Sequence, residues 1–134
     1  SLQVGAKVDR SPYGFTAIQL STWTYSEMSS DTPSTRVPQS QKKAFAFTSP
    51  AGSTFVILPE GEFDSGIDDS ATERCAQILL SGRQAVRCDY SRNGNTPFVT
   101  VVLVQGLPFR IEIRSRSTTD AQLLESLLLA VTIT

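Results

Sequence analysis

A chain of 134 residues, 40% of them hydrophobic, is long enough to form one domain that buries roughly two-thirds of its unfolded surface. Its formal net charge of −1 gives no bulk attraction to nucleic acid or anionic membranes, and its apolar runs are too short to span a bilayer. The sequence contains no histidine, the commonest general base and metal ligand, which argues against an enzyme and against a metal or other cofactor. We therefore expect residues 1–134 to form a single, non-catalytic domain.

The N-terminal part of the chain predicts short strands followed by a long loop. Aromatic and β-branched residues indicate strands at 15–20 and 21–25, after an edge strand or loose start at 2–8 and a turn at 11–14. Residues 28–43 carry two prolines and little apolar content. We interpret them as a mobile loop of about fifteen residues, a length that is unusual in a compact domain.

The middle of the chain predicts a β-hairpin and then an acidic loop. Residues 44–48 and 53–58 have strand composition, and a turn at 49–52 joins them. The second of these strands holds a continuous apolar run, which is typical of a central strand buried on both faces. Residues 60–73 contain six acidic side chains and no basic one, but their spacing does not match a calcium loop. We expect a solvated acidic loop.

Residues 75–115 predict the antiparallel meander around which the chain is organised. In its last strand every second residue from Phe109 is apolar and the intervening residues are charged, so one face packs on a core and the other faces water. The water-facing residues of that strand are Arg110, Glu112 and Arg114. The four strands of the meander are residues 75–80, 83–90, 98–104 and 109–115.

Arginine side chains concentrate on this meander. A row of guanidinium groups on a sheet face holds carboxylates or phosphates bidentately, so we predict a partner-binding surface there. The alternative is a solvated sheet face that balances the acidic loop. Nucleic acid is not favoured, because neither a lysine cluster nor a glycine-rich loop accompanies the row. The predicted partner-binding residues are Arg83, Arg87, Arg110 and Arg114.

The C-terminal part predicts one helix over residues 118–130. Thr119 and Gln122 match a capping box, and Asp120 adds negative charge to the first turn. An apolar stripe of four leucines at 123, 124, 127 and 128 is expected to pack on the sheet, and residues 130–134 form a short final strand. The fold class is therefore α+β: an antiparallel sheet of about six or seven strands with a C-terminal helix, 119–129, packed on one face.

The two cysteines are predicted to form a disulfide. If Ser81 and Gly82 form a two-residue turn, Cys75 lies directly opposite Cys88 in a non-hydrogen-bonded pair, with Cα atoms about 4.5 Å apart. A register shifted by one residue remains an alternative, because it gathers the apolar residues of both strands on one face and moves Cys75 to the other. The disulfide implies an oxidising, extracytoplasmic compartment.

Three segments together resemble the Mog1/PsbP-like domains of secreted lipoproteins and thylakoid-lumen proteins. The first runs from Gly14-Phe15 to Trp23, the second is the strand-turn-strand of residues 78–85, and the third is the strand, helix and strand of residues 109–133. The resemblance covers most of the chain. It implies an antiparallel sheet flanked by helices, no catalytic residues, and an accessory or binding role.

Three functional hypotheses follow. The leading one is a non-catalytic extracytoplasmic domain, secreted, periplasmic or lumenal, that binds a protein partner through the arginine row and residues 28–43. Because the sequence begins at Ser1 and not at methionine, we expect a processed or trimmed chain, and we expect membrane attachment only if a removed N-terminal anchor supplied it.

The two other hypotheses belong to different classes. In a small-ligand-binding domain, Trp23, Tyr25 and Tyr90 would line a pocket, although a structural role for Trp23 in the core is the simpler interpretation. In a hydrolase, Asp64 would pair with Asp68 or Asp69 in a cleft. A closed pocket favours the first of these, and a flat charged face favours the partner-binding domain.

Overall fold

The computed structural model describes residues 5–29, 43–59, 70–92 and 96–134. Within these residues it contains strands, one α-helix and one 3₁₀ turn, η1 (Ser11–Tyr13). The helix is α1 (Thr118–Leu129). The strands are β1 (Gly5–Arg10), β2 (Phe15–Leu20), β3 (Thr24–Ser29), β4 (Lys43–Thr48), β5 (Thr54–Pro59), β6 (Thr72–Leu80), β7 (Arg83–Ser91), β8 (Pro97–Val104), β9 (Phe109–Arg114) and β10 (Thr132–Ile133).

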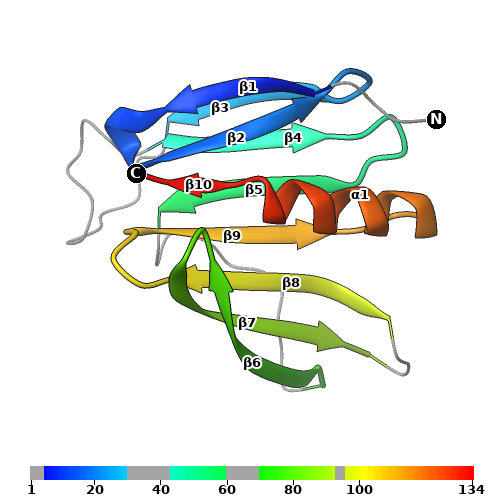
Figure 1. The fold of residues 1–134 in the computed structure, drawn as a ribbon. Helices are drawn as coiled ribbons and strands as arrows, with labels where there is room; N and C mark the ends of the chain where they lie inside the picture. Colours follow the sequence, from blue (N-terminus) through cyan, green and yellow to red (C-terminus); the bar gives the residue numbers. More distant parts are fainter. Residues whose placement is uncertain (1–4, 30–42, 60–69, 93–95) are drawn as a thin grey trace.

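The strands form two antiparallel sheets, and the predicted α+β class is confirmed. The larger sheet has seven strands in the order β3-β4-β5-β9-β8-β7-β6, and the smaller has three in the order β1-β2-β10. The sequence did not predict a separate second sheet. Figure 1 shows that α1 and the three-stranded sheet cover the same face of the large sheet, which we call the inner face. The opposite face is called the outer face.

The core lies between the inner face, α1 and the small sheet. Along the sheet, Phe45, Ile57, Ile111 and Val102 occupy paired positions and are each 0% exposed, as expected where strand alternation directs every second side chain inward. The leucine stripe packs against these side chains as predicted, because Leu124, Leu127 and Leu128 are all buried in the same apolar cluster. The strand predicted to be central, β5, lies between β4 and β9.

Residues at the ends of two predicted loops belong to strands. Met28 belongs to β3, where it pairs with Ala44, and Lys43 begins β4. Backbone pairing therefore extends β3 beyond Tyr25 and starts β4 at Lys43, outside the residues whose composition predicted these strands. Similarly, Glu73 belongs to β6 and not to the acidic loop. Residues 30–42 and 60–69 lie outside the described part of the chain, so the predicted mobility and solvation of these loops remain predictions.

The helix begins at Thr118 as predicted, but its N-cap lies two residues before the predicted one, so the cap assigned to Thr119 is wrong. The N-cap is Ser117, whose backbone is extended and whose hydroxyl accepts a hydrogen bond of 3.0 Å from the backbone N–H of Asp120. Both Ser117 and Thr119 have capping chemistry. The chain selects Ser117 because Asp120 is then the third helical residue and its side chain reaches the sheet.

Asp120 joins the start of α1 to the β4–β5 turn. Its carboxylate accepts hydrogen bonds of 2.7 Å from the hydroxyls of both Ser49 and Ser53, and all three residues are buried. The Ser53 backbone N–H donates to the Ser49 hydroxyl at 2.9 Å, and the Arg116 N–H donates to the Ser53 hydroxyl at 2.7 Å. This cluster fixes the helix on the inner face, and no local sequence pattern predicts it.

The Cys75–Cys88 disulfide is present and the predicted register is confirmed. Leu80 pairs with Arg83, Cys75 pairs with Cys88, and the two cysteine Cα atoms are 4.0 Å apart. Ser81 and Gly82 have φ values of 53° and 75°, the left-handed pair of a type I′ turn that matches the twist of the strands. The shifted register is wrong because this turn, rather than the apolar pattern, sets the pairing.

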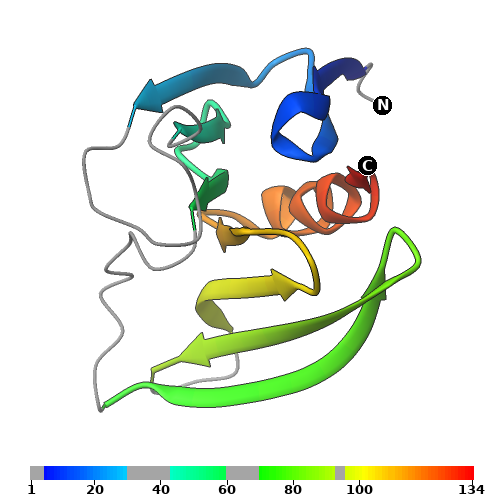
Figure 2. The same ribbon diagram turned by 90° about the vertical axis from the view of Figure 1, so that its left-hand side faces the viewer.

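The β6–β7 hairpin bends toward the inner face, as Figure 2 shows from the side. At its tip the Ser81 hydroxyl accepts a hydrogen bond of 3.0 Å from the backbone N–H of Ile133 in β10. Leu80 beside the tip is 2% exposed and belongs to the core cluster. The hairpin tip thus closes one end of the core.

Candidate functional site

The four predicted partner-binding arginines do not form one row. Arg87 pairs with Val102 and so shares the inner face, and Arg83, four residues earlier on β7, lies on that face too. Arg110 and Arg114 alternate with the buried residues of β9 and therefore lie on the outer face. The alternation in β9 predicted its two faces correctly, but it carries no information on how the faces of β7 lie relative to them.

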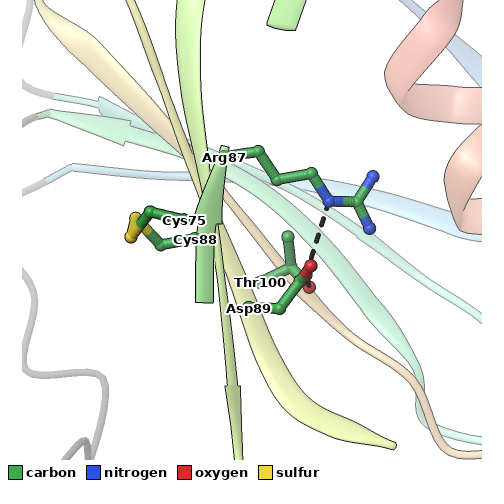
Figure 3. The surroundings of a disulfide bond; sticks show 5 residues. All are labelled: Cys75, Arg87, Cys88, Asp89 and Thr100. Atoms are coloured by element: carbon green, nitrogen blue, oxygen red, sulfur yellow. Dashed lines mark hydrogen bonds and ion pairs between the residues drawn. A yellow bond between two sulfur atoms is a disulfide. The ribbon is translucent and has the colours of Figure 1, made fainter. Parts of the chain in front are cut away.

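Arg87 connects β7 to the helix. Its guanidinium donates to both carboxylate oxygens of Glu125, at 2.7 and 2.5 Å, and its Nε lies 3.4 Å from Asp89. Asp89 in turn accepts a hydrogen bond of 2.5 Å from Thr100 (Figure 3). The hydrogen bonds with Glu125 raise the pKa of Arg87. This residue therefore helps to hold α1 on the sheet.

The charged residues of β9 are less exposed than predicted. Glu112, expected to face water, is 3% exposed and lies 3.2 Å from the Nε of Arg110. Its register neighbours are Val56 on β5 and Val101 on β8, so it is flanked by apolar side chains at the centre of the sheet. A strand at the sheet edge would have left such a carboxylate in water, but β9 is a central strand.

The three aromatic residues of the ligand-pocket hypothesis lie apart. Trp23 is 3% exposed within the core, as its structural interpretation predicted. Tyr25 lies on the inner face of β3, where it pairs with Phe47, whereas Tyr90 shares the outer face of β7 with Cys88. The described residues therefore bring no aromatic pocket together from these three. Asp64, Asp68 and Asp69 lie outside the described residues, and the hydrolase hypothesis remains untested.

Tyr25 belongs to a polar cluster that joins the two sheets. Its hydroxyl donates to Glu27 at 2.8 Å, and Glu27 also accepts from the guanidinium of Arg10 at the end of β1 and lies 3.6 Å from Lys43. Burial, followed by the hydrogen bond to Glu27, raises the pKa of Tyr25 to about 12. The hydrogen bond with Arg10, followed by that with Tyr25, lowers the pKa of Glu27.

We expect one tyrosine of the folded protein to ionise near pH 12. A phenol with a raised folded pKa stabilises the fold fully below the unfolded value of 10.0, and this contribution is lost as the pH rises to about 12. Alkaline titration followed by phenolate absorbance measures the step, which the Tyr25→Phe variant should lose and the Tyr13→Phe control should keep. Ionisation of Tyr25 near pH 10 in the folded protein would contradict the assignment.

The outer face carries a hollow of about 560 Å³ where β6, β7 and β8 lie side by side. Three apolar side chains stand exposed in it, Leu79 at 69%, Val86 at 40% and Leu103 at 39%. The hollow is open and shallow rather than enclosed. Its remaining lining residues are Gln77, Ile78, Gln84, Ala85, Val104, Gln105 and Gly106.

The strand beside this hollow, β6, forms an edge of the seven-stranded sheet. Among the described residues its hydrogen-bonded neighbour is β7. The directly opposed Cys75–Cys88 pair, with Cα atoms 4.0 Å apart, is a non-hydrogen-bonded pair, so the backbone N–H and C=O of Cys75 point away from β7. By the same alternation, Gln77 and Leu79 present their backbone groups at the open edge and their side chains on the outer face.

Comparisons with known proteins support the fold. No family model and no curated protein matches the sequence. The solution structure of cyanobacterial PsbP (CyanoP) from Synechocystis sp. PCC 6803 matches all of this chain and 95% of that chain, with a TM-score of 0.56 and 9% sequence identity. The chain therefore has a PsbP-like fold, as the sequence resemblance predicted. No helix in the described ranges is long and apolar enough to cross a bilayer.

Proposed function

We propose that this chain is a non-catalytic, extracytoplasmic accessory domain that binds a protein partner, and that the partner contributes an extended segment that pairs with β6. The observation that carries the proposal is the juxtaposition of an open strand edge and an exposed apolar hollow. The disulfide favours an oxidising compartment, and the PsbP-like fold agrees with an accessory role.

The apolar side chains supply the first argument. Leu79, Val86 and Leu103 come from three adjacent strands, and Val86 lies directly opposite both Gln77 and Leu103. Contiguous exposed apolar surface marks interaction sites on soluble proteins, whereas scattered single residues carry no such meaning. The hollow is too open to enclose a small molecule, but it suits side chains presented from a neighbouring segment.

The open edge supplies the second argument. An extended peptide that adds to a sheet edge gains main-chain hydrogen bonds from the edge strand, and its alternate side chains contact the sheet face beside it. Gln77 and Leu79 each offer backbone groups at the strand edge and a side chain on the outer face. A partner segment with apolar residues at every second position therefore matches this surface.

Two arginines extend the proposed surface. Arg110 lies opposite Leu103 on the outer face, and Arg114 lies further along the same strand. Arg110 places a guanidinium beside the apolar hollow, where it pairs with Glu112, and Arg114 adds positive charge further along the outer face, so an acidic residue beyond the apolar ones would complement Arg114. Arg83 at the inner side of the hairpin tip is a further candidate contact, whereas Arg87 is engaged with Glu125.

The test uses the disulfide-bonded protein to select peptides from a displayed library of random extended sequences. We expect enrichment of alternating apolar sequences, with backbone amide shifts in β6 on binding. The Leu79→Lys variant should weaken binding at least tenfold, because it places a charge in the hollow. Leu129→Lys on α1 is the matched control, since Leu129 is 75% exposed, does not line the hollow and belongs to the helix that covers the opposite face (Figure 1).

A second variant separates main-chain pairing from apolar contact. Gln77→Pro removes an N–H that points away from β7, so the β6–β7 ladder and the apolar residues remain while the edge loses a donor. It should also weaken peptide binding. Peptides that bind both variants as tightly as the native protein, or that shift residues of another strand, would contradict the proposal.

A further inference from the structure

A cluster of metal-ligating atoms lies at the exposed end of the β6–β7 hairpin. A carboxylate oxygen of Glu73 and the sulfurs of Cys75 and Cys88 all lie within 4.8 Å of one another. Glu73 and Cys75 are exposed and Cys88 is half-buried. In Figure 3 the sulfurs point away from Arg87 and Asp89, so the cluster is on the outer face.

Strand geometry explains why these three residues meet. Glu73 and Cys75 are two residues apart on β6, so their side chains share a face, and Cys88 lies directly opposite Cys75. Tyr90 lies opposite Glu73, so its side chain shares the outer face with the Glu73 carboxylate. The ligand atoms therefore come from paired strands, with the Tyr90 phenol on the same face as a candidate to orient the carboxylate.

We propose that reduction of the Cys75–Cys88 disulfide converts this cluster into a binding site for a thiophilic divalent cation such as Zn²⁺. A dithiol reductant transfers two electrons and two protons, the S–S bond breaks, and the reductant leaves as its own disulfide. When the metal binds, each thiol loses its proton to solvent and forms a bond to the metal. Glu73 supplies the third ligand and water the fourth.

The chemistry of the ligands fits this cation. Zinc prefers four ligands at about 2.0–2.3 Å in tetrahedral sites of cysteine, histidine and carboxylate groups, so neighbouring ligand atoms lie roughly 3–4 Å apart. Reduction frees the two sulfurs to separate toward this range, and the Glu73 carboxylate lies within 4.8 Å of both. Exposed disulfides are also those that thiol reagents reduce most readily. Covalent and metal linkages would thus join β6 and β7 at the same position.

The test titrates Co²⁺, and then Zn²⁺, into two samples of the protein. One sample keeps its disulfide, and the other is reduced with a phosphine that is removed before metal is added. We expect one tetrahedral Co²⁺ per reduced chain, with sulfur-to-metal charge-transfer absorbance that Zn²⁺ abolishes. The disulfide-bonded protein should give no such signal. Equal binding by both forms, or no binding by the reduced form, would overturn the proposal.

Variants distinguish this site from ordinary thiol binding. Glu73→Gln should weaken Zn²⁺ affinity at least tenfold, and Tyr90→Phe should weaken it by a smaller factor because it only orients the carboxylate. Asp89→Asn is the matched control, since Asp89 is a carboxylate on the same hairpin but on the inner face. Unchanged affinity in Glu73→Gln would remove the carboxylate from the site and overturn the three-ligand assignment.

If the reduced protein loses structure, circular dichroism tests the same site through the recovery of folding on addition of Zn²⁺. In that case Zn²⁺ added during reduction should restore the β-sheet spectrum and a cooperative thermal transition, because binding to the folded form stabilises it. The Cys75→Ser, Cys88→Ser double variant should gain nothing from Zn²⁺. Failure of Zn²⁺ to restore the wild-type spectrum would count against the site.

Discussion

Replacing Leu124 with alanine should lower the free energy of unfolding by about 2–5 kcal/mol, the range for leucine truncation in a packed core. Leu124 is 1% exposed and faces the apolar residues of the seven-stranded sheet. The truncation removes favourable burial and leaves a cavity that the paired strands beneath it cannot close. Urea unfolding of both proteins measures the difference.

The matched control is Leu129→Ala on the same helix. Leu129 is 75% exposed, so its truncation should change the free energy of unfolding by less than about 0.5 kcal/mol, as for other surface substitutions. Leu127→Ala provides a second buried site, at 3% exposure. Losses below about 1 kcal/mol at both Leu124 and Leu127 would mean that the helix does not pack on the sheet as described.

Replacing Asp120 with alanine should destabilise the protein by about 3 kcal/mol, because hydrogen bonds to charged groups each contribute roughly 1.5–3 kcal/mol. The change leaves the hydroxyls of Ser49 and Ser53 without their carboxylate acceptor in a buried site. It also removes a negative charge from the first turn of α1. Denaturant unfolding gives the magnitude.

A double-mutant cycle with Ser53→Ala tests whether the effect arises from this cluster. If it does, the two substitutions together should cost less than the sum of their separate effects, since each alone already breaks their shared hydrogen bond. Glu125→Ala serves as the control for loss of a carboxylate from the same helix, and it should cost about 1 kcal/mol or less because that ion pair is exposed. Strict additivity of Ser53→Ala and Asp120→Ala would contradict the assignment.

Local patterns in the sequence predicted the elements that depend on near neighbours. The alternation in β9 identified its buried face, the leucine spacing identified the inner side of α1, and the Ser81-Gly82 turn fixed the cysteine pairing. In each case a short stretch of chain contains all the information, because turn geometry and side-chain periodicity act over a few residues.

The features that the sequence did not predict depend on contacts between distant segments. Ser49 and Asp120 are unremarkable polar residues until the fold brings the β4–β5 turn to the start of the helix. The arginines could not be divided between two faces without the relative register of β7, β8 and β9. The exposed apolar hollow depends on the same register, since Leu79, Val86 and Leu103 lie on three different strands.

The small sheet has a consequence for how the chain folds during synthesis. Its order, β1-β2-β10, places β10 beside β2, and the backbone N–H of Thr134 donates to the carbonyl of Gly14 at 2.9 Å. Contacts between such distant segments form slowly, because a long loop must close before they contribute stability. A nascent chain therefore presents the unpaired side of β2 until residues 132–134 emerge. During that interval, protection from strand pairing with other chains would have to come from outside the domain.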